Sequence, residues 1–251
     1  MKREAQNLLL VLIGGAVLWI ALDGAYLRYV KPSLYPFLLI SGIGFILLGL
    51  VAIVRDIRRG TATEKEHHEH GSGRSHWLLL IPAAALLLIA PPALGASAAV
   101  TSSPVQIVPR DTAPAAPKQW PFPPLPSDPA PNLPVVDLVN RALLDSNHSL
   151  DGREVTVSGF IIHPKDLEQQ HPATAEADLA RVVITCCVAD ARYVLVHLAG
   201  LPEPIEDDAW LEVRGIVQTD SAQHDPDQTP TLAVIDYQRI PAPDRPYERG
   251  R

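Results

Sequence analysis

The sequence predicts a composite fold, with a membrane region of three α-helical spans followed by a small all-β domain with one flanking helix. Three observations carry this prediction. Two segments near the N-terminus are about twenty residues long and almost free of charge, and a third apolar run follows them. A proline-rich segment then separates the apolar part from the rest of the chain. Beyond it, five short segments rich in β-branched residues indicate strands.

The apolar segments are long enough to cross a bilayer. Residues 8–27 contain Asp23 as their single charge, and residues 34–54 contain none. At about 1.5 Å per residue each segment spans about 30 Å, the thickness of the hydrocarbon core. Residues 77–98 contain three prolines and no charge. We therefore expect a two-span hairpin in residues 1–60 and a third span in residues 77–98, all embedded in the lipid bilayer.

Basic residues set the expected orientation. Lys2 and Arg3 precede the first span, and Arg28 and Lys31 lie between the first two. The loop between the second and third spans is richer in positive charge, with Arg55, Arg58, Arg59, Lys65 and Arg74. The positive-inside rule places the N-terminus and this loop in the cytoplasm. We expect a three-pass protein of the cell membrane whose C-terminal domain is extracytoplasmic.

Charge also divides the chain. Residues 1–95 contain 9 Lys and Arg against 6 Asp and Glu, whereas residues 96–251 contain 12 against 22. The membrane part is therefore basic and the following domain is acidic. Nucleic acid is not an expected partner, because binding to phosphates relies on clustered Lys and Arg.

Two linkers connect these parts. Residues 61–76 form a histidine-rich cytoplasmic loop in which His67, His68 and His70 lie among carboxylates. Such a loop either binds a divalent metal such as zinc weakly or is simply solvated. Residues 99–134 are predicted to form an extended proline-rich stalk. Its Trp120 and Phe122 either dock on a partner or on the domain itself.

The third apolar run admits a second interpretation. A basic flank, an apolar core and the small residues Ala96 and Ala98 on either side of Ser97 also resemble an internal signal peptide. Cleavage near Ala98 would release the outer domain.

Residues 135–251 are predicted to form the outer domain. Apolar residues recur at helical spacing from Val135 to Leu143, after Pro134. Expected strands follow at residues 153–162, 181–186, 193–198, 210–218 and 231–240. Gly159 and Gly215 interrupt the first and fourth strands, where bends are expected. Five short strands of this kind favour an OB-like barrel, and an immunoglobulin-like sandwich is the alternative.

Cys186 and Cys187 are the two cysteines of the chain. Adjacent residues on a strand point to opposite faces, so one thiol is expected in the core and the other outside. Their Cα atoms, about 3.8 Å apart, disfavour a disulfide between them. Asp190 and His197 are close in sequence, so a metal or thiol site is one hypothesis. Ordinary packing of both cysteines, a disulfide to a partner and heavy-metal capture are the others.

Motifs of the common enzyme classes are absent. The sequence contains no GxSxG, Walker loop, HExxH or dinucleotide fingerprint. We therefore expect a protein that is not an enzyme.

Several stretches together resemble a known family. They are the Tyr29-Val30-x-Pro32 loop, GREVTVSGF at 152–160, RVVITCCVADA at 181–191 and the tail ending near Tyr247. The chain resembles the YcgQ-like family of permease subunits. The positions that carry the resemblance in the outer domain are Gly159, Phe160, Arg181, Cys186, Cys187, Ala189, Asp190 and Ala191.

The resemblance implies an accessory membrane protein that works beside a separate multi-spanning permease in metal-ion or small-solute transport. The alternative is an extracytoplasmic metal-binding or thiol-redox protein that uses Cys186 and Cys187.

Overall fold

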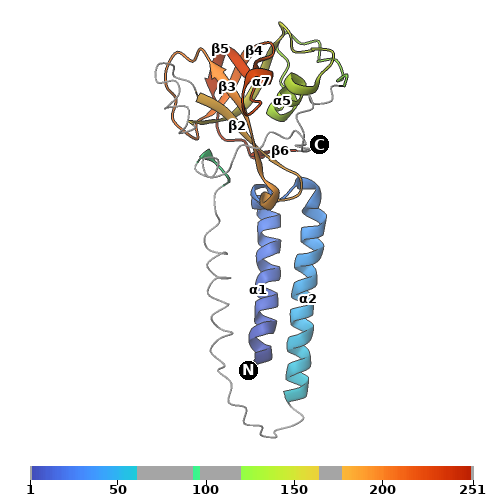
Figure 1. Cartoon of the computed structure of the whole chain (residues 1–251). Helices are drawn as coiled ribbons and strands as arrows, with labels where there is room; N and C mark the ends of the chain where they lie inside the picture. Colours follow the sequence, from blue (N-terminus) through green and yellow to red (C-terminus); the bar gives the residue numbers. More distant parts are fainter. Residues whose placement is uncertain (1, 61–92, 97–119, 164–176, 250–251) are drawn as a thin grey trace. The chain divides into compact units, whose positions relative to one another are not determined.

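A computed structural model describes residues 2–60, 93–96, 120–163 and 177–249 (Figure 1). The chain divides into two compact units, Met1–Pro92 and Ala93–Arg251. The expected histidine-rich loop with His67, His68 and His70 lies outside the described residues. So does most of the expected third span, of which residues 93–96 are described.

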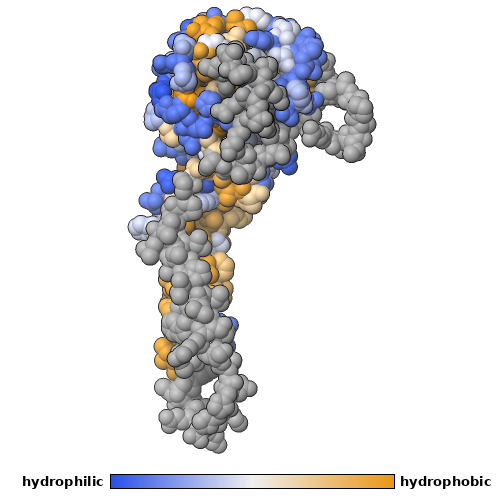
Figure 2. All heavy atoms as spheres, turned by 60° about the vertical axis from the view of Figure 1, so that its left-hand side comes forward, coloured by the Kyte–Doolittle hydropathy of each residue, from blue (hydrophilic) through white to orange (hydrophobic). Residues whose placement is uncertain are grey.

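The described part of the first unit, residues 2–60, is a helical hairpin. Helices α1 (Lys2–Asp23) and α2 (Tyr35–Gly60) are joined by two short 3-10 turns, η1 (Ala25–Arg28) and η2 (Pro32–Leu34). Both helices are long and apolar enough to cross a membrane, judged by length and composition. Large apolar side chains are exposed along them, as the orange surface in Figure 2 shows. The first helix ends four residues before the expected boundary, because Gly24 adopts a left-handed conformation with φ 82°.

Glycines bring α1 and α2 into close contact. A Cβ atom on Gly14 would lie 2.8 Å from the carbonyl oxygen of Gly42, and one on Gly49 would lie 2.6 Å from Val11 Cγ2. Small residues allow such a close backbone approach between membrane helices. The two helices therefore pack directly against each other.

In the second unit, five strands of the described chain close a barrel (Figure 1). They are β1 (Glu154–Ile162), β2 (Ala177–Ile184), β3 (Arg192–Ala199), β4 (Trp210–Val217) and β5 (Thr231–Arg239). The order around the barrel is β1-β2-β3-β5-β4, and β4 returns to β1. Strands β3 and β5 run parallel, whereas the other pairs are antiparallel. The predicted five-stranded barrel is confirmed, and the sandwich alternative is wrong.

Both predicted glycine positions lie where strands approach closely. A Cβ atom on Gly159 would lie 2.6 Å from the carbonyl oxygen of Ala180 on β2. At Gly215 the pairing of β4 with β5 is shifted, which marks a bulge, and a side chain there would collide with the backbone of Ala233. These glycines let β1 and β4 pass close to their neighbours as the barrel closes.

The strands differ from the prediction in two respects. Strand β2 begins at Ala177 rather than at residue 181, and it ends at Ile184, before the cysteines. A short sixth strand, β6 (Tyr247–Arg249), pairs in parallel with the last residues of β2. The predicted start of β2 is too late because of Asp178, since a carboxylate is unusual inside a fully buried strand.

Apolar side chains fill the barrel and also cover part of its outside. Helix α5 (Val135–Leu144) confirms the predicted amphipathic helix and packs with the inner core. A second cluster lies on β1, β2 and β3 together with Ala96, and Leu94 packs against it. On these strands, the residues of the second cluster alternate with residues of the inner core. They are Phe160, Ile162, Ala180, Val182, Ile184, Tyr193 and Leu195. The short helix α7 (Ser221–His224) precedes β5.

Residues 120–134, assigned to the stalk from the sequence, pack on the barrel domain. Phe122 is buried in the inner core, and its ring stacks on that of Trp120 with centroids 5.8 Å apart. The Leu133 N–H donates to the carbonyl oxygen of Thr156. Trp120 and Phe122 thus dock on their own domain, and the packed region begins before residue 135.

Candidate functional site

The cysteines lie in the connection between β2 and β3. The chain leaves β2 at Ile184, passes through both cysteines and enters the 3-10 turn η4 (Val188–Asp190) before β3 begins. Cys186 is exposed, Cys187 is partly exposed, and both are free thiols. The expectation that one cysteine lies in the core is wrong, because the strand ends before its side-chain alternation reaches them.

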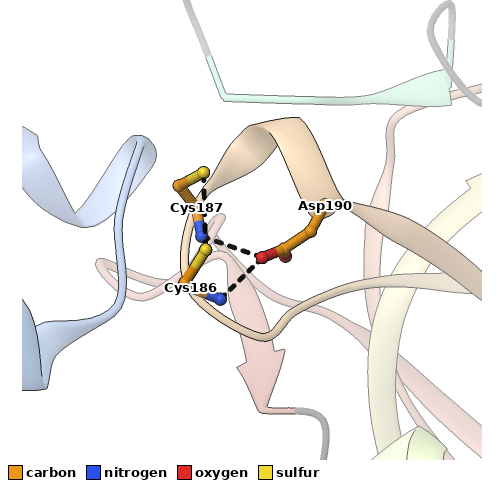
Figure 3. A group of neighbouring side chains, drawn as sticks. All are labelled: Cys186, Cys187 and Asp190. Carbon is orange, nitrogen blue, oxygen red and sulfur yellow. Dashed lines mark hydrogen bonds between the residues drawn. The ribbon is translucent and has the colours of Figure 1, made fainter.

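Asp190 organises this connection (Figure 3). Its carboxylate accepts backbone N–H bonds from Thr185 at 2.7 Å, Cys186 at 2.8 Å and Cys187 at 3.3 Å. In return, the Cys187 side chain accepts the backbone N–H of Asp190, which completes a capping box around η4. The Cys187-x-x-Asp190 spacing therefore fixes the shape of the loop and the direction of both thiols.

Three ligand-type side chains converge here. The Cys186 and Cys187 Sγ atoms are 3.7 Å apart. One ligand atom from each of Cys186, Cys187 and Asp190 lies within 4.8 Å of the other two. Among the described residues, this is the one cluster of three metal-ligating side chains found. Sequence proximity predicted the grouping of the cysteines with Asp190.

The electrostatics of the loop favour protonated thiols. Interaction of the Cys186 thiol with the Asp190 carboxylate raises the pKa of Cys186 to about 11. The same interaction, together with the backbone N–H bonds, lowers the pKa of Asp190 to about 2. Reactive thiolates are found in the opposite environment, beside positive charges or helix N-termini. Without a cation, Cys186 is a thiol at neutral pH.

His197 lies elsewhere in the barrel. On the β2–β3 ladder, His197 lies opposite Asp178. The Val183–Arg192 pair, which is at the cysteine end of the same ladder, is five residues further along, or about 17 Å away. Its Nδ1 lies 2.6 Å from Asp178 Oδ1 and its Nε2 lies 3.4 Å from Asp225 Oδ2. The hypothesis that His197 joins the cysteine site is therefore wrong.

The His197 cluster is an ionic network. Burial alone lowers the pKa of His197, but the Asp178 carboxylate outweighs it and raises that pKa to about 9. Burial raises the pKa of Asp178, and the imidazolium acts against this shift. Asp225 Oδ1 also accepts the N–H groups of Asp227 and Thr229, which makes this stretch a structured turn. Both imidazole nitrogens are thus committed to carboxylates.

The remaining predicted positions lie in the barrel frame. The Arg181 guanidinium on β2 lies 4.9 Å from the Trp210 ring centroid, and Phe160 packs on the same ring at 5.5 Å. Gly159 provides the close approach between β1 and β2. None of these three residues belongs to the cluster of Cys186, Cys187 and Asp190 among the described residues.

Two residues with important contacts were missed from the sequence. Asp178 pairs with His197, and Glu248 on β6 pairs with Arg181. The position of Asp178, an acidic residue within an apolar run, could have indicated its ion pair from the sequence. Nothing local distinguished Glu248, because its partners come from distant segments.

Part of the chain matches a protein-family model. Residues 139–248 match the family model described as the DUF1980 C-terminal domain. The matched region starts within α5 and ends within β6, so it contains the five barrel strands and the cysteine loop. The match is consistent with the resemblance to the YcgQ-like family. Searches of curated proteins and of solved structures returned no match.

Proposed function

We propose that this chain is a non-enzymatic, membrane-anchored accessory subunit of a separate multi-spanning permease for a metal ion or small solute. Two apolar helices joined to a barrel similar to the DUF1980 C-terminal domain are compatible with a membrane-associated accessory protein. The helices would anchor the subunit, and the acidic barrel would lie outside the cytoplasm. A third span would connect the two parts.

The close packing of α1 and α2 carries the proposal. Gly14 and Gly49 bring the two helix backbones together, which leaves no room for a solute between them. The Asn7 side chain donates to Asp56 Oδ2 at 2.9 Å and closes one end of the hairpin. A hairpin of this kind serves as an anchor or a docking element. Transport would then require a pathway supplied by a partner protein.

The barrel would be OB-like. The order β1-β2-β3-β5-β4, the parallel β3–β5 pair and the close approach at Gly159 support this assignment. Leu94, Ala96 and Tyr247 pack on the apolar outer face of β1, β2 and β3. That cover and the acidic charge of this half both argue against nucleic acid as a ligand of the barrel.

A thiol-redox role is the second candidate, because two free thiols lie side by side. The Asp190 carboxylate works against it, since it raises the pKa of the Cys186 thiol to about 11. A redox or nucleophilic cysteine requires a stabilised thiolate. The raised pKa of Cys186 therefore argues against a redox cysteine in the metal-free chain.

Affinity purification of the full chain from native membranes in mild detergent tests the main proposal. We expect a polytopic membrane protein to co-purify in fixed ratio. As a control, a variant whose α1 and α2 are replaced by an unrelated apolar hairpin should reach the membrane without this partner. Purified chain that moves a solute into liposomes by itself would overturn the proposal.

A further inference from the structure

We propose that the β2–β3 connection binds one thiophilic divalent cation of the Zn²⁺ type through Cys186 Sγ, Cys187 Sγ and one carboxylate oxygen of Asp190. This site goes beyond the accessory role, and it stands or falls independently of any permease partner.

The spacing of the sulfur atoms fits tetrahedral coordination. Two metal–sulfur bonds of about 2.3 Å at a tetrahedral angle place the sulfurs about 3.8 Å apart. The Cys186 and Cys187 Sγ atoms are 3.7 Å apart. A linear two-coordinate ion with similar bonds would need sulfurs about 4.6 Å apart. The pair is thus preorganised for a tetrahedral ion.

Asp190 is positioned to act as the third ligand. Its two oxygens offer about four acceptor positions. Backbone N–H groups of Thr185, Cys186 and Cys187 occupy three of them. The fourth faces the Cys186 thiol, and it becomes available to a cation when that thiol gives up its proton on metal binding. Carboxylates that bind metals are commonly held by such additional hydrogen bonds. The fourth coordination position is open to water or to a donor from a partner.

Exposure gives the cation access to the site. Cys186 is exposed, and Cys187 and Asp190 are partly exposed. Two thiolates and one carboxylate carry a charge of −3, which a divalent cation reduces to −1. Binding converts two thiols and the cation into a dithiolate complex, and two protons leave to solvent. No oxidant or reductant takes part.

His197 is not a ligand of the proposed site. The described residues therefore supply two sulfur donors and one oxygen donor. The two ring nitrogens of His197 face Asp178 and Asp225. The donor atoms also distinguish the proposed site from the histidine-rich loop of residues 61–76. That loop offers nitrogen and oxygen donors but no sulfur. Sulfur ligation is therefore the decisive observable.

Titration of the reduced full chain in detergent with Cd²⁺ and then Zn²⁺ tests the proposal. We expect one equivalent of Cd²⁺ to produce a sulfur-to-metal charge-transfer absorption band, and a large excess of Zn²⁺ to replace the Cd²⁺ and remove this band. Zn²⁺ affinity should rise by up to 100-fold per pH unit below the thiol pKa values, because two protons are released.

Variants locate the ligands. Cys186→Ser combined with Cys187→Ser should abolish the band, and Asp190→Asn should keep it but weaken Zn²⁺ binding by about 10- to 100-fold. Ala189→Ser, which places a serine in the same loop at an exposed position, should bind like the original chain. The combined His67→Ala, His68→Ala and His70→Ala variant should keep the band. A fully reduced chain without the band, or one that keeps it after loss of both thiols, would overturn the proposal.

Discussion

Glu248 Oε1 lies 3.3 Å from Arg181 Nε, and each side chain retains 9% exposure. The two Glu248 oxygens also accept the N–H groups of Val135 and Val136, the first residues of α5. Carboxylates are favoured at helix N-termini, where N–H groups lack partners within the helix. One side chain of β6 thereby joins β2, β6 and α5.

We expect Glu248→Ala to destabilise the barrel by about 3 to 5 kcal/mol, because it leaves the Arg181 charge buried without its partner. Chemical denaturation of the full chain, followed by tryptophan fluorescence, measures the loss. Arg214→Ala is the matched control, since its pair with Glu154 is exposed, and it should cost less than about 1 kcal/mol. Equal losses would show that burial of the Arg181–Glu248 pair does not matter.

Phe122 provides a test of where the packed domain begins. Phe122→Ala should cost about 3 to 5 kcal/mol, because it empties a buried position of the inner core. Trp120→Ala should cost much less, since Trp120 retains 48% exposure. The same denaturation experiment compares the two variants. A negligible effect of Phe122→Ala would mean that residues 120–134 contribute little to the domain.

His197 should make barrel stability depend on pH. Its pKa is raised from 6.5 to about 9 in the folded chain. Its stabilisation is therefore fully present below about pH 6.5 and is lost as pH rises through about 9. Between these pH values, the free energy of unfolding of the His197→Gln variant should depend less on pH than that of the original chain. Because the other histidines are unchanged in both chains, identical pH curves would contradict this assignment.

Asp190 should control the reactivity of Cys186. In a Cys187→Ser background without metal, alkylation of Cys186 should rise with pH towards a midpoint above that of free cysteine, because the Asp190 carboxylate raises the pKa of this thiol. Asp190→Asn removes the carboxylate charge and should move the midpoint towards that of free cysteine, about 8.5. Mass spectrometry after timed alkylation measures both rates. An unchanged midpoint would show that Asp190 does not act on the thiol.

Gly14 and Gly15 are adjacent on α1 but differ in surroundings. A Cβ atom on Gly14 would lie 2.8 Å from Gly42, whereas nothing lies within 4 Å of one on Gly15. Gly14→Ala should destabilise the helical hairpin by about 1 to 3 kcal/mol through overpacking. Gly15→Ala should be neutral or stabilise it by up to about 1 kcal/mol. Thermal melts followed by far-ultraviolet circular dichroism compare the two, and similar shifts would contradict the packing described.

Local sequence patterns were enough to predict several features of the fold and of the cysteine loop. The length of the apolar segments indicated α1 and α2, and helical spacing indicated α5. Alternation and β-branched residues located five strands, and Gly159 and Gly215 marked positions of close strand approach. The Cys187-x-x-Asp190 spacing also brought the cysteines and Asp190 together, because four consecutive residues form one turn.

Other features depend on which groups pair in the folded chain, and no sequence pattern predicts this pairing. Strand β2 ends at Ile184 because Asp190 captures the N–H groups of the next residues, and this removes both cysteines from the strand and its alternation. The pairing of His197 with Asp178 follows from the β2–β3 register, which no local pattern specifies. A charged residue such as Glu248 enters the barrel only when Arg181 and the start of α5 compensate its desolvation, and those partners lie more than sixty residues away in the sequence.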